Sequence, residues 1–207
     1  MKKTATIILN RNLPKETDVL VEHLMHHDGK FTDVFVVEAG SEKENLSKYC
    51  TWHVHSEEVI KHGLRYLRGM NYGLLQLWNS NKWKMYESFF LITNDTKLPK
   101  GQETIKTLQT LLNQHPKLGL VSPCSENWGE KELIGRSSTK YFWFIHNNAY
   151  FLRRDFIDQL INTVDSTYMD FLFDGSNFRG YLSETEIIAK AYANDWAAAI
   201  TTLVFAE

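Results

Sequence analysis

A chain of 207 residues with a formal net charge of −2 at pH 7 can bury a core as a single domain. Its lysines and arginines are mixed with acids, so the charge gives neither the basic field that attracts nucleic acid nor a polybasic stripe for a membrane surface. Two cysteines that lie far apart, Cys50 and Cys124, indicate neither a zinc site nor a disulfide framework, and they fit a reducing cytoplasm.

Short apolar runs alternate with amphipathic stretches in the first half of the chain. The runs predict buried strands, whereas apolar residues three and four positions apart predict helices. The expected elements are a strand over 6–9, a helix over 16–27, strands over 33–37 and 51–54, one helix over 57–78 that Ser56 caps, a strand over 89–93, a helix over 105–112 and a strand over 118–122. This alternation predicts an α/β fold with a mostly parallel sheet flanked by helices.

The second half of the chain is less regular. It predicts a loop over 125–139, an aromatic strand over 141–145, a helix over 153–164 and a helix over 183–192 that Ser183 caps. The apolar run after the basic N-terminus is too short for a signal peptide, and nothing approaches the about 20 apolar residues of a membrane-spanning helix.

Polar residues stand directly after three of the predicted strands. Asn10 follows the first strand, Glu38 the second, and Asp95 the strand over 89–93. Ligands of open α/β sheets bind in the crevice at the carboxyl ends of the strands, so we expect these three side chains to converge there. Helix capping or turn formation is the alternative role for Asp95, and turn formation is the alternative for residues 38–41.

Six segments, taken in order, resemble the GT-A glycosyltransferases of the family-2 type: 7–10, 36–41, 68–73, 92–96, 115–123 and 181–186. The resemblance covers nearly the whole chain. It implies one Rossmann-like GT-A domain, with a nucleotide-sugar-binding half over 1–123 and an acceptor-side half over 124–207. It also implies a cytoplasmic hexosyltransferase of polysaccharide biosynthesis, able to work at the inner membrane face, that transfers sugar with inversion from a UDP-, GDP- or dTDP-linked donor to a glycan or lipid-linked acceptor.

For the donor, the resemblance assigns roles to residues at the strand ends. Asp95 matches the last acid of the family's Asp-x-Asp-like motif and would hold Mg²⁺ or Mn²⁺ against the leaving diphosphate, while Thr93 stands in the motif's first position. Glu38 matches the acid that contacts the nucleoside, and Gly40 would let the backbone come close. The other donor-binding positions that the resemblance implies are Asn10, Arg11, Arg68, Asn71 and Asn94. The alternatives are a solvated helix face for Arg68 and a buried amide satisfied by backbone for Asn71.

The resemblance also implies a general base. Glu184 occupies the position of the carboxylate that takes the proton from the acceptor hydroxyl, although Ser183 replaces a neighbouring acid. Both Glu184 and Glu186, the second candidate base, would alternatively complement a helix N-terminus. Candidate acceptor contacts, each with a structural alternative, are Trp143, Phe144, His146 and Asn147.

Two other classes of protein remain open. A non-catalytic GT-A module that binds a glycan or a partner chain is favoured by Thr93, Ala39 and Ser183, which stand where acids or amides are usual. A nucleotidyltransferase has less support because no Gly-rich, Lys-bearing loop follows the first strand. Family members continue beyond the equivalent of Glu207, so we expect a minimal enzyme, a fragment of a longer protein, or a subunit completed in a homo-oligomer.

Overall fold

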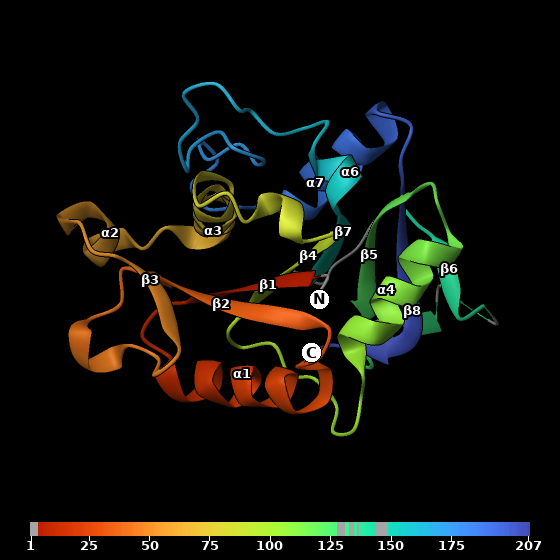
Figure 1. Cartoon of the computed structure of the whole chain (residues 1–207), viewed down its shortest axis with the longest axis horizontal. Helices are drawn as coiled ribbons and strands as arrows, with labels where there is room; N and C mark the ends of the chain where they lie inside the picture. Colours follow the sequence, from red (N-terminus) through yellow and green to blue (C-terminus); the bar gives the residue numbers. More distant parts are fainter. Residues whose placement is uncertain (1–3, 128–130, 133–134, 136, 144–148) are drawn as a thin grey trace.

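The computed structural model describes residues 4–127, 131–132, 135, 137–143 and 149–207, which form a single α/β domain (Figure 1). The elements in chain order are β1 (Thr4–Asn10), α1 (Pro14–Asp28), β2 (Thr32–Ala39), the 3-10 helix η1 (Lys43–Asn45), β3 (Cys50–Val54), α2 (Glu57–His62), α3 (Arg65–Asn79), the 3-10 helix η2 (Trp83–Met85), β4 (Ser88–Thr93), α4 (Thr104–Gln114), β5 (Leu118–Cys124), β6 (Thr139–Tyr141), β7 (Tyr150–Arg153), α6 (Arg154–Ile157), α7 (Ser183–Ala193) and β8 (Ala197–Phe205).

The described strands form one mixed sheet in the order β3-β2-β1-β4-β7-β5-β8-β6. β1 runs parallel to β2 and β4, β2 to β3, and β5 to β8, whereas β7 is antiparallel to β4 and β5, and β6 to β8. The prediction of a mostly parallel sheet is therefore wrong in the second half of the chain. The physical reason for the error is that an apolar run indicates that a strand is buried but does not indicate the direction of the strand.

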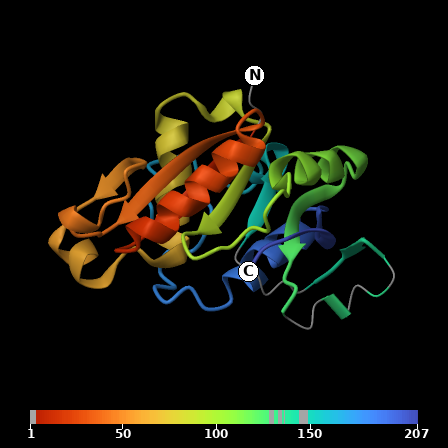
Figure 2. The ribbon, with the colours of Figure 1, turned by 90° about the horizontal axis from the view of Figure 1, so that it is seen from below.

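Helices cover both faces of the sheet. α3, α6 and α7 lie on one face, and α1 and α4 lie on the other (Figure 1, Figure 2). Phe89 packs in the core on the α3 side and its neighbour Phe90 in the core on the α1 side, and both are fully buried. Ile7 and Ile8 divide in the same way. Continuous apolar runs are what strands covered on both faces require, so this part of the sequence prediction is confirmed.

The single helix expected over 57–78 is two helices. α2 ends at His62, and Gly63 follows it with a φ of 71° while its N–H donates to the Val59 carbonyl at 2.7 Å. With a ψ of 167° this positive φ lies in a region that only glycine adopts readily, so this turn needs glycine. Arg65 also has a positive φ, 61°, and begins α3 in a new direction. The break brings the start of α3 to the carboxyl end of β1.

Other predicted boundaries need correction in the second half. The strand expected over 141–145 is β6, which ends at Tyr141, and residues 144–145 lie outside the described part of the chain. The helix expected to reach 164 ends at Ile157. Ser183 does not cap α7: the capping position is Leu182, which has no side-chain oxygen, and Ser183 is the first helical residue. β8 was not predicted at all, because its first residues are alanines, which have low β propensity.

Candidate functional site

A cavity of about 190 Å³ lies at the carboxyl ends of β1, β2 and β4. Its walls come from β1 and the loop after it, from the end of β2, from the start of α3 and from the turn after β4. The residues that line it are Leu9, Asn10, Arg11, Ala39, Arg65, Thr93, Asn94 and Asp95. Four predicted donor-binding residues therefore meet in one place because three parallel strands end side by side.

A hydrogen-bonded chain links the three strand ends. Asn94 Nδ2 donates to Asn10 Oδ1 at 2.7 Å, and Asn10 Nδ2 donates to both carboxylate oxygens of Glu38 at 3.0 and 2.9 Å. Glu38 is fully buried and also accepts from Ser41 Oγ at 2.5 Å and from the Ser47 N–H at 2.8 Å. The Glu38 carboxylate is thus behind the cavity wall, where it fixes the orientation of Asn10 and, through it, of Asn94.

Arg11 and Gly40 join α2 to the strand ends. Arg11 Nη2 donates to the carbonyls of Ile60 at 2.8 Å and Lys61 at 3.2 Å, which are two of the last carbonyls of α2. Gly40 has a φ of 84°, and a Cβ there would lie 2.0 Å from the Val59 carbonyl oxygen. The close backbone approach that Gly40 permits is therefore made to α2.

Asp95 and Arg65 are the exposed charged residues of the cavity. The Asp95 carboxylate makes no hydrogen bond or ion pair with any residue that the structure describes. Arg65, which sequence reasoning missed, begins α3, and its guanidinium carbon lies 5.7 Å from the centre of the Phe178 ring. Gly63 was the available signal in the sequence. A glycine inside an amphipathic stretch can end one helix before a second begins, and the basic residue that follows it then lies at a helix N-terminus.

Arg68 and Asn71 are not among the residues that line this cavity, and they hold the segment 168–178 on α3. Asn71 Nδ2 donates to the carbonyls of Tyr168 at 3.0 Å and Phe173 at 2.8 Å, and Asn71 Oδ1 accepts from the N–H groups of Leu172 and Phe173 at 3.0 and 2.9 Å. Arg68 Nε donates to the Gly175 carbonyl at 2.7 Å. Asn71 is thus a buried amide that the backbone satisfies, which was the structural alternative for it.

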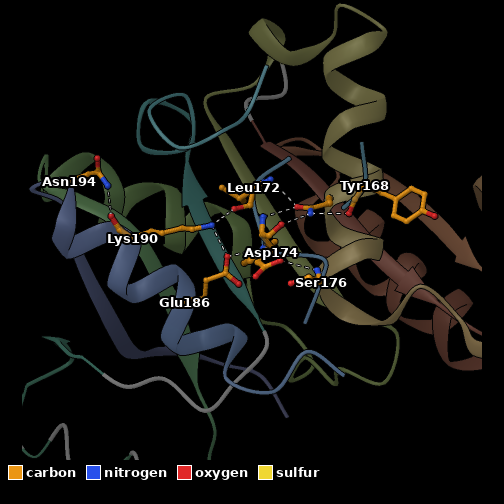
Figure 3. A network of polar contacts seen from close by, with 9 residues as sticks. Tyr168, Leu172, Asp174, Ser176, Glu186, Lys190 and Asn194 are labelled. Carbon is orange, nitrogen blue, oxygen red and sulfur yellow. Dashed lines mark hydrogen bonds and ion pairs between the residues drawn. The ribbon is translucent and has the colours of Figure 1, made fainter. Parts of the chain in front are cut away.

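A second network holds the same segment on α7 (Figure 3). Lys190 Nζ donates to Glu186 Oε1 at 2.6 Å and to the Leu172 carbonyl at 2.5 Å, and Glu186 Oε1 also accepts from the Asp174 N–H at 2.9 Å. Glu186 is therefore engaged by a lysine and a backbone donor. Because the segment is tied to both α3 and α7, it fixes the spacing between the two helices.

Glu184 is half-buried at the start of α7 and less engaged than Glu186. Its one described side-chain partner is Ser183 Oγ, 3.3 Å from Oε2. Burial, then Tyr150 and the negative charge of Glu184, raise the pKa of Tyr66 well above its ordinary value. The turn before Glu184 packs on the start of α3, because a Cβ on Gly180 would lie 3.9 Å from Tyr66 Cβ.

The structure describes only part of the remaining predicted site. Trp143 is 73% exposed, while Phe144, His146 and Asn147 lie outside the described residues. Within the described ranges, no three His, Cys, Asp or Glu residues are grouped as a metal site would need. A larger cavity of about 970 Å³ lies toward the amino ends of the strands, beside the start of β2, and includes none of the predicted residues.

No family model matches the chain, and no curated protein matches it. Among solved structures, the chain is similar to the mannosyltransferase PcManGT from Pyrobaculum calidifontis, with 13% identity and a TM-score of 0.62 over 96% of this chain and 54% of that one. It is also similar to GalNAc-T7, with 10% identity and a TM-score of 0.68 over 99% and 42%. For residues 1–349 of TarS from S. aureus the identity is 14% and the TM-score 0.58, over 97% and 58%.

The chain thus spans about half the length of these three solved structures. Among its described helices, none combines the length and the apolar character needed to cross a bilayer. Nearly the whole chain superposes on these enzymes, and the chain has the GT-A fold that they share.

Proposed function

We propose that the chain is a glycosyltransferase that takes its sugar from a nucleotide-sugar donor. The observation that carries the proposal is the cavity at the carboxyl ends of β1, β2 and β4, where Asp95 and Arg65 offer exposed, opposite charges within a GT-A fold. PcManGT was solved in complex with GDP-Man and Mn²⁺, and GalNAc-T7 with UDP, GalNAc and Mn²⁺. A metal-bound nucleoside diphosphate would use both charges of the cavity in this chain.

The diphosphate end of the donor is assigned to Asp95, Arg65 and Asn94. Asp95 supplies a hard, exposed carboxylate that fits Mg²⁺ or Mn²⁺ when diphosphate oxygens and waters complete the shell. Such an ion would act as a Lewis acid on the leaving diphosphate. Arg65 would pair with the same negative charge, since guanidinium groups match phosphate geometry. Asn10 and Glu38 act behind them by fixing Asn94.

Glu184 is assigned the role of general base. In the inverting reaction the acceptor hydroxyl oxygen bonds to the anomeric carbon while the bond from that carbon to the diphosphate oxygen breaks, and its electron pair stays on the diphosphate. The hydroxyl proton passes to Glu184. Its small hydrogen-bond load supports Glu184 over Glu186, which Lys190 and the Asp174 N–H occupy. Residues 1–123 would then bind the donor and residues 124–207 would serve the acceptor.

Calorimetric titration of the chain with UDP, GDP and dTDP, each with and without Mn²⁺, tests the donor site. We expect one nucleotide to bind in a metal-dependent manner, and Asp95→Asn to weaken that binding at least about tenfold, because removing a charged ligand costs on the order of 1.5–3 kcal/mol. The melting temperature should hardly change, since Asp95 is exposed. Asp195→Asn is the matched control, because it removes an exposed carboxylate in the turn between α7 and β8. Absence of binding by all three nucleotides, or equal losses in the two variants, would refute the donor site.

A further inference from the structure

A separate cavity of about 390 Å³ lies between α1 and the loop that joins β4 to α4. Figure 2 shows this loop running alongside the helix. Asn94 and Asp95 line both this cavity and the one at the strand ends, so the two cavities meet at the turn after β4. On the helix side, Lys15, Val19 and His23 stand four residues apart and therefore form one stripe along α1.

The loop wall of this cavity has a fixed path. The Lys97 N–H donates to the Glu207 carbonyl at 2.8 Å, and the Lys97 carbonyl accepts from the Glu207 N–H at 3.0 Å. Gln102 Nε2 donates to the Phe205 carbonyl and Gln102 Oε1 accepts from the Phe205 N–H, both at 2.8 Å. Leu98 packs on the hydrophobic core beneath α1. The cavity is therefore preformed, which keeps the ordering cost of binding low.

His23 brings an unpaired polar atom to the cavity that it lines. Its Nε2 is buried and has no hydrogen-bond partner among the described residues. Burial, followed by the charges of His27 and His26, lowers the pKa of His23 below its ordinary 6.5, so the ring is neutral at pH 7. Nearly all buried polar atoms of folded proteins are hydrogen-bonded. The His23 ring therefore has the capacity to bind one polar group of a ligand.

The other side chains around this cavity are apolar or charged. The apolar ones are Val19, Leu20 and Leu98. The charged ones are three lysines, Lys15, Lys97 and Lys100, and two acids, Glu16 and Asp95. None of the three ammonium groups forms an ion pair or a hydrogen bond with a residue that the structure describes. In a chain whose net charge is −2, this cavity thus has an excess of positive charge, which favours an anionic ligand.

We propose that this cavity binds a medium-chain aliphatic carboxylate. The alkyl chain lies against Val19, Leu20 and Leu98, the carboxylate accepts a hydrogen bond from His23 Nε2–H, and the unpaired lysines supply the favourable charge. A volume of about 390 Å³ is within the range of small-molecule sites, which is about 300–1,000 Å³. The site is separate from the sugar transfer proposed above, and it can be tested with no nucleotide present.

Titration of the ¹⁵N-labelled chain with octanoate, followed by ¹H–¹⁵N NMR, measures both affinity and location. We expect saturable shifts that are largest at the amides of Val19, His23 and Leu98. Hexanoate should bind about tenfold more weakly than octanoate, because each buried CH₂ contributes about fourfold in affinity. Octanol should bind about fivefold more weakly, because a hydrogen bond to a neutral oxygen is weaker than one to a carboxylate.

Two pairs of variants on α1 test the walls of the cavity. His23→Phe keeps a ring but removes Nε2, and it should weaken octanoate binding about tenfold. His26→Phe is its control, because His26 is exposed on the same helix and does not line this cavity. Val19→Glu puts a carboxylate where the alkyl chain lies and should abolish saturable binding. Met25→Glu is the matched control, because Val19 and Met25 are 66% and 57% exposed and Met25 lies outside this cavity.

Several results would overturn the carboxylate site. Shifts that do not saturate, or equal effects within either pair of variants, would remove the cavity from the explanation. Octanol binding as tightly as octanoate would make the surface a plain apolar groove, and butyrate binding as tightly would make it an anion patch. Binding to phosphatidylglycerol vesicles without saturable octanoate binding would assign the surface to a membrane. If Val19→Glu abolishes octanoate binding while His23→Phe fails to fold, the Val19 and Met25 pair decides in favour of the site.

Discussion

Glu38→Gln distinguishes a framework role of the buried carboxylate from direct contact with the donor. Wild-type Glu38 accepts from Asn10, Ser41 and Ser47, and each oxygen has two hydrogen-bond contacts. A glutamine keeps one oxygen, but its amide must face the Asn10 amide and either Ser41 Oγ or the Ser47 N–H. The Ser41 hydroxyl can turn to accept from the new NH₂ group, whereas the hydrogen bond from Asn10 Nδ2 to the replaced oxygen is lost. One lost bond to a charged acceptor costs about 1.5–3 kcal/mol, so we expect a loss of about 2 kcal/mol in the free energy of unfolding.

Urea denaturation and nucleotide titration of the same variant give the two readouts. We expect reduced stability together with a moderate loss of nucleotide affinity, because Glu38 reaches the cavity only through Asn10 and Asn94. Glu42→Gln is the control: Glu42 is exposed in the following loop, and such surface changes stay within about 0.5 kcal/mol. Unchanged stability with abolished nucleotide binding would refute the framework role and restore the direct nucleoside contact that the resemblance implies.

Three further substitutions test the base, the loop anchor and a buried acid. Glu184→Gln should slow transfer by about 10²–10⁴-fold at nearly normal donor affinity, since the amide cannot take a proton; unchanged turnover would leave Glu184 as a helix-dipole residue. Asn71→Ala should lower the unfolding free energy by about 2–4 kcal/mol, because it leaves four backbone groups, three of them in buried contacts, without their partner, and a change below 1 kcal/mol in urea denaturation would contradict this. Burial raises the pKa of Asp28 above its ordinary 3.8, although N–H groups of α4 oppose the shift. The folded state therefore binds the proton of Asp28 more tightly than the unfolded state does. The stability that this proton contributes is fully present below pH 3.8 and is lost as the pH rises through the pKa of the folded state. Asp28→Asn should accordingly be more stable than wild type at pH 7, with a difference that shrinks toward pH 3.8; a constant difference across that range would contradict the shift.

The meeting of Asn10, Asn94 and Asp95 at one cavity could be predicted because it depends on strand ends. Apolar runs located β1, β2 and β4, and parallel pairing in register then brings Asn10 beside Glu38. The same logic could not distinguish a residue that lines the cavity from a residue that lies behind the cavity wall. Glu38 and Asp95 are both acids after buried strands, yet one is fully buried and the other exposed. The difference comes from Ser41 and Ser47, whose hydrogen bonds depend on the path of the loop.

The second half of the chain could be predicted only in part because its geometry depends on long-range contacts. The segment 168–178 has no regular helix or strand, and side chains from α3 and α7 hold it through its backbone. Hydrophobic periodicity carries no trace of such contacts. The roles of Asn71 and Glu186 in holding this segment became visible only when both helices were placed on the same face of the sheet.

Local conformational rules fail at two points of the described chain, and both points are helix starts. Six non-glycine residues have a positive φ, and four of them are Asn or Asp, which tolerate it. The other two are Arg65 and Leu182, at the starts of α3 and α7, and neither helix has a side-chain cap. α1, α4 and α6 also begin without a hydrogen bond from their N-cap side chain, so the positive φ, and not the missing cap, distinguishes these two helix starts. Sequence reasoning that assumes local consistency therefore missed the start of α3 inside the helix expected over 57–78, whereas it placed the start of α7 within one residue.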